Sequence, residues 1–309
     1  MGKSKISQKH FHDEDAARAW FETARWPNGP VCPHCQSVKH YATKKAGRYR
    51  CASKDCRKDF TVMTGTVMER SHSPLTHWAY AFTTACDGKK GFAAHQLMRQ
   101  LGCQYNTAWF LHHRVMEAMR RGGLETPMGG EGKIVEADET YYGKAATLRV
   151  SKQRKGRPFT KKGHLWNNRP IVALVERGGD IRTFHVAVAD KETVAGIVTK
   201  NILKESRLHT DESRLYTGMD QHFSAHETVK HSAKEYVRGD IHTNSAEGFF
   251  GIFKRGMRGV YQHCAEKNLH RYLAEYEFRY NTRKISDGER AVLAIKGGEG
   301  KRLTYRQPH

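Results

Sequence analysis

The sequence predicts a multidomain protein, in which a small metal-binding module and a helical segment precede a C-terminal α/β domain. Three observations predict this organisation: four cysteines cluster near the N-terminus, a glycine-rich segment interrupts the chain at 122–132, and short β-type runs follow it. The 309 residues are enough for two or three domains with buried cores. We therefore expect domains at 1–70, 71–122 and 133–309, with a linker at 123–132.

The charge balance indicates a polyanionic partner. Lys and Arg number 53 against 32 Asp and Glu, which gives a formal net charge of +21. A surplus of this size is typical of proteins that bind nucleic acid, so we expect DNA as a partner. The chain has no run of 18 apolar residues and no apolar signal-peptide stretch at its N-terminus. We expect no membrane association and a cytoplasmic protein that associates with the nucleoid.

The four clustered cysteines predict a structural metal site. Cys32, Cys35, Cys51 and Cys56 follow the pattern C-x2-C, fifteen residues, C-x4-C. Four thiolates at one closed tetrahedral site suit Zn²⁺, and so small a module needs the metal to fold. The segments at 40–50 and 59–62 then read as short strands of a zinc ribbon. Four unrelated free cysteines are the alternative, and His34 is expected outside the metal shell.

The next segment predicts helices joined by a turn. Ser73 and Pro74 fit a helix N-cap followed by proline at the first helical position. Within 91–121, apolar residues are spaced as in a helix-turn-helix, with Gly102 at the turn. The second helix would expose Gln104, Tyr105, Asn106, Trp109 and His112 or His113. A hairpin that only packs is the alternative, but the net charge and the zinc ribbon favour DNA contact.

After the linker, the order of predicted elements indicates an α/β fold. These elements are strands at 133–139, 170–176 and 181–188, a helix at 191–204, a strand at 207–211 and a helix beginning within 242–256. The second and third strands flank a Gly-Gly-Asp turn, which is a hairpin signal. Three strands, a helix, a strand and a helix is the order of an RNase H-like domain. Residues 144–163 hold eight Lys or Arg and no acid, and read as a basic insertion.

Three acids stand where phosphoryl-transfer chemistry would need them. Asp138 is expected to end the first strand, Asp211 the fourth, and Glu247 lies early in the later helix. Carboxylates are hard oxygen ligands that can hold two Mg²⁺, or Mn²⁺, for cleavage of a phosphodiester. Lys254 follows Glu247 by seven residues, on the same helix face, and could contact a DNA phosphate. A solvated surface charge is the alternative for any one acid, and Asp220 is the main competitor for the second position.

Several segments together resemble the DDE transposases of insertion sequences. They are EADETYYGK (136–144), HTDES (209–213), HTNSAEGFFGIFKRGMRGVYQH (242–263), RYLAEYEFRYNTR (271–283) and the stretch 49–75. The resemblance is strongest to the ISXO-type group, whose members carry an N-terminal zinc ribbon. It extends over most of the chain from about Trp26.

The resemblance implies a transposase that binds the terminal inverted repeats of its element through the ribbon and the helix-turn-helix. It implies Asp138, Asp211 and Glu247 as the catalytic acids, with Lys254 as their partner lysine. Hydrolysis at the element end would free a 3′-OH that attacks target DNA, and a homodimer or larger synaptic assembly would hold two ends. Some relatives carry Asn as the third ligand; because Lys254 keeps its offset from Glu247, Asn244 is expected to be a helix cap.

Two other functions are compatible with the residues. One is a DNA-binding regulator derived from a transposase whose acids no longer bind metal; the intact set of three acids and one lysine argues against it. The other is a stand-alone RNase H-like nuclease that cleaves DNA without joining it. Only the resemblance separates this second alternative from a transposase.

Overall fold

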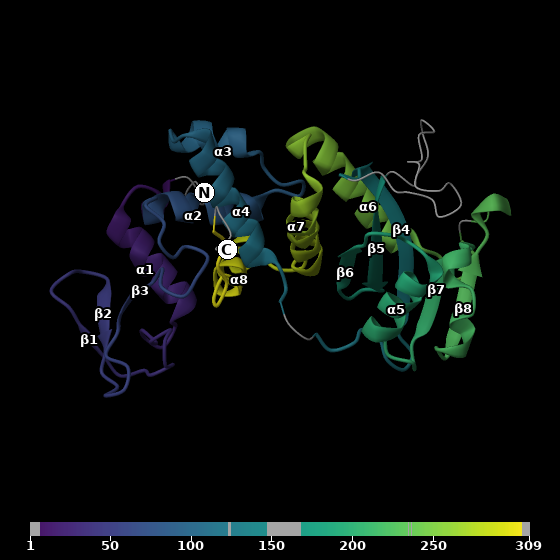
Figure 1. The fold of residues 1–309 in the computed structure, drawn as a ribbon, viewed down its shortest axis with the longest axis horizontal. Coiled ribbons are helices and arrows are strands. Elements are labelled where there is room, and N and C mark those ends of the chain that lie inside the picture. The colour runs from purple at the N-terminus through teal and green to yellow at the C-terminus, as the bar shows by residue number, and fades with distance from the viewer. Residues whose placement is uncertain (1–6, 123–124, 147–167, 234, 236, 305–309) are drawn as a thin grey trace, which may run out of the picture. The chain divides into compact units, whose positions relative to one another are not determined.

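The computed structural model describes residues 7–122, 125–146, 168–233, 235 and 237–304. The chain forms two compact units: the first comprises residues 1–121 with 282–309, and the second comprises residues 122–281. Figure 1 labels the helices and strands of both units. Most of the predicted basic insertion, from residue 147 onward, lies outside the described residues.

The first unit contains the three short strands that the sequence predicted for a zinc ribbon. Strands β1 (His40–Ala42), β2 (Arg48–Cys51) and β3 (Asp59–Thr61) form an antiparallel sheet in that order. Phe60 is buried in this sheet, and its ring lies 5.6 Å from that of Tyr49. So small an apolar core cannot hold the ribbon together alone, which leaves a role for the cysteines.

Five α-helices make up most of the rest of the first unit in its described residues. They are α1 (Glu14–Arg25), α2 (Leu75–Asp87), α3 (Ala94–Leu101), α4 (Tyr105–Met119) and α8 (Asp287–Gly297). Helix α2 packs against α1, α4 and α8, and the buried aromatic rings of Phe21, Trp78 and Phe82 lie among them. Helix α8 starts with a capping box between Ser286 and Glu289, which defines its first turn.

The start of α2 differs from the prediction by one residue. Pro74 occupies the N-cap position and Leu75 is the first helical residue, so the expected Ser73 cap is wrong. The backbone N–H groups of Leu75 and Thr76 donate instead to the carboxylate of Glu14, at 2.7 and 3.2 Å. A carboxylate from α1 thus satisfies donors that have no partner within α2.

Helices α3 and α4 form the predicted pair with a tight turn. Gly102 ends α3 in the left-handed conformation, with φ 61° and ψ 27°, and its N–H donates to the carbonyl of Met98. This conformation strongly favours glycine at a helix C-terminus. Helix α4 follows after only two further residues, so the two helices form a compact helical hairpin.

Only the beginning of α4 is exposed. The side chains of Tyr105 and Asn106 face solvent, whereas every residue from Leu111 to Met119 is buried. The expectation that His112 or His113 is exposed is therefore wrong. The ring of His112 packs 4.5 Å from that of Phe92, and His113 is 0% exposed. The C-terminal half of α4 belongs to the core of the first unit.

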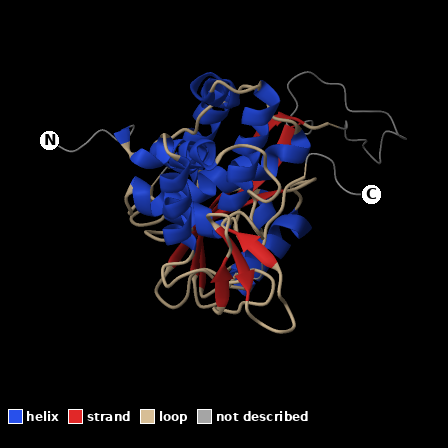
Figure 2. Ribbon diagram, turned by 90° about the vertical axis from the view of Figure 1, so that its left-hand side faces the viewer, coloured by secondary structure: helices blue, strands red, loops and turns tan. Residues whose placement is uncertain are grey.

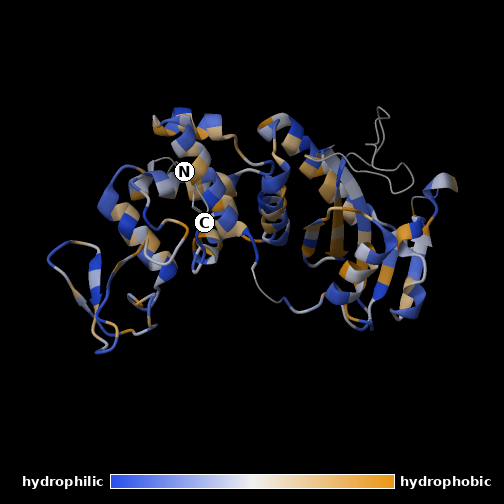
Figure 3. Ribbon diagram, viewed as in Figure 1, coloured by the Kyte–Doolittle hydropathy of each residue, from blue (hydrophilic) through white to orange (hydrophobic). Residues whose placement is uncertain are grey.

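The second unit is built on a five-stranded mixed sheet in the order β6-β5-β4-β7-β8, shown red in Figure 2. The strands are β4 (Ile134–Lys144), β5 (Asn168–Glu176), β6 (Ile181–His185), β7 (Arg207–Asp211) and β8 (Ala225–Val229). The β4–β5 and β5–β6 pairs are antiparallel, whereas the β4–β7 and β7–β8 pairs are parallel. Strand β5, with the sequence NRPIVALVE, carries the hydrophobic colour of Figure 3 along much of its length.

Helices cover both faces of this sheet. On one face, Val194 and Val198 of α5 (Lys191–Asn201) pack against Val135, Leu174 and Leu208 of the central strands. The opposite face carries α6 (Asn244–Gly256) and α7 (Leu269–Asn281). There the ring of Phe253 lies 5.4 Å from that of Tyr142 on β4 and 5.3 Å from that of Tyr276 on α7. Because side chains alternate along a strand, β4 contributes to both layers.

The C-terminal segment is not part of the second unit, although the sequence predicted a single domain at 133–309. Residues 282–309, with α8, join the first unit, so the second unit ends at Asn281. The side chain of Arg290 on α8 donates to the carbonyl of Cys86 at 2.6 Å, which ties this segment to the end of α2. Among the described helices, none is long and apolar enough to cross a membrane.

Candidate functional site

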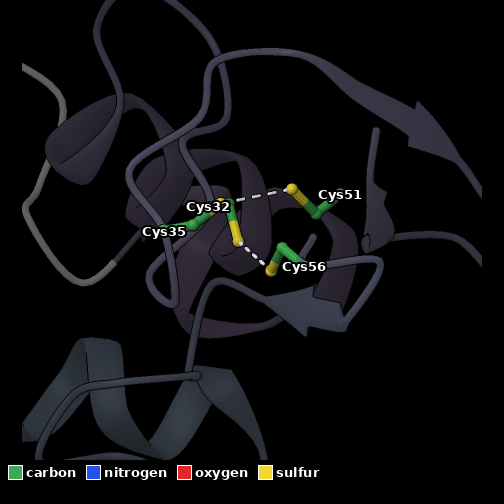
Figure 4. Close-up of side chains that lie close together, drawn as sticks. All are labelled: Cys32, Cys35, Cys51 and Cys56. Atoms are coloured by element: carbon green, nitrogen blue, oxygen red, sulfur yellow. Dashed lines mark hydrogen bonds between the residues drawn. The ribbon is translucent and has the colours of Figure 1, made fainter. Parts of the chain in front are cut away.

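The four predicted metal-binding cysteines come together in the ribbon. Their sulfur atoms all lie within 4.8 Å of one another, and Figure 4 shows the side chains converging. The Sγ atoms of Cys32 and Cys56 are 3.7 Å apart, and those of Cys35 and Cys51 are 3.4 Å apart. The prediction that these four residues form one group is confirmed. Within the described part of the chain, the group does not include His34.

Two tight turns produce this convergence. In the first, the N–H of Gln36 donates to the carbonyl of Cys32 at 2.8 Å; in the second, the N–H of Arg57 donates to the carbonyl of Ser53 at 3.1 Å. Gln36 and Arg57 both have positive φ, at 61° and 48°, and each directly follows a cysteine. Each turn reverses the chain behind that cysteine, so the thiols of both segments face one centre. Four thiol donors in this arrangement suit Zn²⁺.

Two of the three predicted acids lie on adjacent parallel strands. In the β4–β7 pair, Glu136 is opposite His209. Asp138 and Asp211 each follow by two residues, so they lie on the same face of the sheet. Asp211 ends β7 as predicted, but β4 continues to Lys144, so the expectation that Asp138 ends its strand is wrong. The antiparallel pairing with β5 extends β4 beyond the end of β7.

The third acid lies on the helix that covers this face. Glu247 is in the first turn of α6, with its side chain 47% exposed. Its Oε1 atom accepts a hydrogen bond from the Thr243 hydroxyl at 3.4 Å and lies 3.6 Å from Nε2 of His231. Lys254 follows two turns later on the same helix.

Electrostatics connect these groups. Burial, and then the negative charges of Glu139, Asp211 and Glu247, raise the pKa of Asp138 to about 8. Burial lowers the pKa of Lys254, and the charge of Asp138 acts in the opposite direction. Within the described residues, the three predicted acids do not form a group with ligand atoms inside 4.8 Å. Their mutual repulsion is an environment that a bound cation would relieve.

A fourth acid, Glu139, anchors the turn after Asp211, and the sequence did not predict this role. Its carboxylate accepts hydrogen bonds from the Ser213 hydroxyl at 3.0 Å and the Tyr216 hydroxyl at 2.9 Å. Burial, followed by the charge of Asp211, raises the pKa of Glu139. The N–H of Ser213 also donates to Asp211 at 2.9 Å. Ser213 therefore links two of the acids through its backbone and side chain.

The two competing site residues lie in other settings. Asn244 is the first residue of α6 and Thr243 occupies the N-cap position, so the expectation that Asn244 is the cap is wrong. Asp220 lies in a short 3-10 turn, Met219–Gln221, and is exposed. It is therefore not at a strand end, in contrast to Asp211.

Comparisons with known proteins agree with this architecture. Residues 129–281 match the ISXO2-like transposase domain, and residues 12–59 match the transposase zinc-ribbon domain. An uncharacterized protein in transposable element ISH50 of Halobacterium salinarum is 30% identical over 283 residues, which cover 88% of this chain and 92% of that protein.

A solved structure gives a much weaker match. It is a cryo-EM structure of the simian T-cell lymphotropic virus intasome in complex with PP2A regulatory subunit B56 gamma, with a TM-score of 0.28 and 11% identity. The match covers 59% of this chain and 63% of that chain. The domain matches and the ISH50 relative are sufficient: this chain belongs to the family of ISXO2-like transposases with an N-terminal zinc ribbon.

Proposed function

We propose that this protein is the transposase of an insertion sequence, which binds terminal inverted repeats and catalyses metal-dependent cleavage and strand transfer of DNA. The observation that carries the proposal is the placement of Asp138 and Asp211. They lie on one face of two adjacent parallel strands, beneath the helix that bears Glu247 and Lys254. Family membership supports the same reaction.

The order and directions of the strands support an RNase H-like assignment for the second unit. The first three strands form an antiparallel meander, and the fourth and fifth add in parallel beside the first. Helix α5 crosses one face between β6 and β7, and α6 covers the other. This topology places β4 beside β7, and for that reason Asp138 and Asp211 lie on neighbouring strands.

Asp138, Asp211 and Glu247 would hold Mg²⁺, or Mn²⁺ in its place. Carboxylate oxygens are the ligands that these hard cations prefer. The pKa of Asp138 is raised first by burial and then by the negative charges of Glu139, Asp211 and Glu247, which a bound cation would offset. When bound, the cation would activate the attacking oxygen and stabilise the departing one. Lys254 would contact a DNA phosphate, because it carries positive charge on the helix that bears Glu247. Asp211 is held in place through Ser213.

The ribbon would hold one structural Zn²⁺ through Cys32, Cys35, Cys51 and Cys56. Helices α3 and α4 would act as a helix-turn-helix, with the exposed first turn of α4 facing the major groove. DNA is thus the proposed partner at both the element ends and the target. Because two ends must be joined to one target, we propose a homodimer or a larger synaptic assembly.

The first turn of α4 yields a specificity prediction. Gln104 and Asn106 are exposed amides that can form paired hydrogen bonds with adenine. The Gln104→Ala/Asn106→Ala double variant should reduce discrimination between end DNA and random DNA by about 1–3 kcal/mol for each base that these amides recognise. Competition binding with the two duplexes measures the ratio. Random-sequence affinity should stay unchanged, and an unchanged ratio would mean that this turn does not read bases.

The raised pKa of Asp138 yields a stability prediction for protein without added divalent cation. The folded state binds this proton more tightly than the unfolded state, so the stabilisation is complete below pH 3.8 and is lost progressively up to about pH 8. Asp138→Asn should therefore raise the free energy of unfolding at pH 8 by about 1–3 kcal/mol and have little effect near pH 4. Denaturant unfolding of both proteins at the two pH values tests this, and equal curves at pH 8 would contradict it.

A labelled duplex that carries the terminal repeat of the element tests the proposed function. With Mg²⁺, the wild-type protein should cleave at the repeat and join the freed 3′ end to a second duplex. Replacement of Mg²⁺ by Ca²⁺ should preserve binding and stop both steps. Cleavage without joining would indicate a nuclease, and binding without cleavage would indicate a DNA-binding regulator.

A further inference from the structure

One carboxylate in the second unit has a role that the reaction does not explain. Glu136 is 0% exposed and lies on β4, two residues before Asp138 on the same face. Its Oε2 atom accepts hydrogen bonds from the N–H of Ser245 at 2.8 Å and of Ala246 at 3.2 Å. Its Oε1 atom accepts from the Ser245 hydroxyl at 3.0 Å. A residue on a strand therefore accepts the hydrogen bonds of the free N–H groups in the first turn of α6.

Helix α6 has no cap of its own. Thr243 is at the N-cap position, but its side chain makes no capping hydrogen bond. Its hydroxyl donates instead to Glu247 at 3.4 Å. The first N–H groups of a helix have no partner within the helix, and the helix dipole favours a negative charge there. Glu136 supplies both the acceptor and the charge from the neighbouring sheet.

Arg177 balances this buried charge and holds the segment that leads into α6. Its Nε and Nη2 atoms donate to Oε1 of Glu136 at 3.1 and 2.9 Å. Its Nη1 atom donates to the carbonyl of Asp240 at 2.7 Å, and Nδ1 of His242 lies 3.4 Å from the same Oε1 atom. A buried carboxylate is costly unless its partners are all in place, so this network permits few alternative positions of the helix.

The network joins the two elements that carry the first and third acids. Asp138 follows Glu136 by two residues on β4, and Glu247 follows Ser245 by two residues in the first turn of α6. A shift of the α6 N-terminus would therefore move Glu247 relative to Asp138, while β7 would keep Asp211 in place.

We propose that Glu136 is a positioning residue of the active site: by capping α6 it fixes Glu247 relative to Asp138, and so completes the metal site. Glu136 acts through Glu247 and does not itself touch the reacting atoms. This role rests on the proposed function, because it assumes that the three acids bind the metal ion.

Glu136→Gln tests the role with little change in size. An amide NH2 replaces one carboxylate oxygen, so a donor faces either the helix N–H groups or Arg177. In either orientation the negative charge at the α6 N-terminus is lost. The matched control is Glu176→Gln at the end of β5. The Glu176 carboxylate accepts hydrogen bonds from Lys133 at 2.7 Å and from the Gly129 N–H at 3.0 Å, away from the α6 N-terminus.

Metal binding is measured by titrating Mn²⁺ into the zinc-loaded full chain, with free Mn²⁺ followed by electron paramagnetic resonance. Glu136→Gln should weaken Mn²⁺ binding by about 10- to 100-fold, whereas Glu176→Gln should stay within about twofold of wild type. In a Glu247→Gln background, adding Glu136→Gln should cause no further loss, because the pair acts as one unit. Amide hydrogen exchange at Ser245 and Ala246 should accelerate in Glu136→Gln.

Ser245→Ala is the second variant, in case Glu136→Gln does not fold. It removes one hydrogen bond to Glu136 and keeps the helix, so Mn²⁺ binding should weaken by about threefold, and only when Glu247 is present.

Three results would overturn the proposal, and they differ in what they mean for the proposed function. If Asp138→Asn and Glu247→Gln weaken Mn²⁺ binding but neither Glu136→Gln nor Ser245→Ala does, the positioning role fails and the proposed function stands. The positioning role would also fail, and the proposed function would stand, if Glu136→Gln or Ser245→Ala weakened Mn²⁺ binding as much in the Glu247→Gln background as in the wild type. If Mn²⁺ binding is insensitive to Asp138→Asn and Glu247→Gln, the proposed function fails, and the positioning role fails with it.

Discussion

Asp138→Asn, Asp211→Asn and Glu247→Gln are each expected to abolish DNA end cleavage and strand transfer, with rates falling by about 1,000-fold or more. Each change removes a metal ligand and one negative charge, so both the affinity for Mg²⁺ and its placement fail. The measurement is a gel assay with a labelled duplex that carries the terminal repeat. A variant that cleaves at the wild-type rate would remove that acid from the proposed site.

Binding to end DNA is the control for these variants. The ribbon and the α3–α4 hairpin belong to the first unit, whereas the acids belong to the second. Affinity for the terminal repeat should therefore remain within about twofold of wild type. Lys254→Ala should lower the rate by only about 10- to 100-fold, because it removes a phosphate contact and leaves the metal ligands in place.

The second large effect that we expect is the loss of zinc when a ribbon cysteine is replaced. Metal analysis should find about one zinc per chain, and Cys51→Ser should lose it. The ribbon sheet has only three short strands and few buried apolar side chains. Small zinc modules bind Zn²⁺ with a free energy of about 10–16 kcal/mol. Binding of this strength would therefore supply the free energy that folds the ribbon. Without zinc, the ribbon should unfold and the preference for end DNA should disappear.

Cys264→Ser is the matched control for the zinc prediction. Cys264 lies in the second unit, and its thiol donates to the carbonyl of Ala265 at 3.3 Å, a bond that a serine hydroxyl can also make. This variant should keep its zinc and its preference for end DNA. Full zinc retention after replacement of all four ribbon cysteines by serine would contradict the assignment.

Local signals in the sequence predicted the elements that depend on local chemistry. The cysteine spacing predicted the ribbon, the Gly-Gly-Asp turn predicted the β5–β6 hairpin, and Gly102 predicted the α3–α4 turn. The buried face of α1, with Ala17, Phe21 and Ala24, also follows helical spacing, so this missed helix could have been found. Strand β8 has the sequence AHETV, which lacks an apolar run, and pairing with β7 is what forms it.

The features that the sequence did not predict depend on contacts between distant residues. Helix α8 belongs to the first unit because it packs against α1, α2 and α4, and Arg290 reaches the carbonyl of Cys86, 204 positions away. Strand β4 continues beyond Asp138 because β5 extends beside it. Glu136 caps a helix 109 positions later, so no local pattern could distinguish it from a solvated acid. The sequence predicted which acids lie on strands and on the helix. The residues that hold those acids in place could be identified only from the folded structure.

The most direct test of the catalytic site compares positions 244 and 247 in a joining assay with labelled end DNA and Mg²⁺. Glu247→Gln should give no joined product, because its carboxylate is the third metal ligand. Asn244→Ala should join at a rate within about tenfold of wild type, because Asn244 is an exposed first helical residue and Glu136 supplies the cap. Normal joining by Glu247→Gln, together with an inactive Asn244→Ala, would contradict the account and make Asn244 the third ligand.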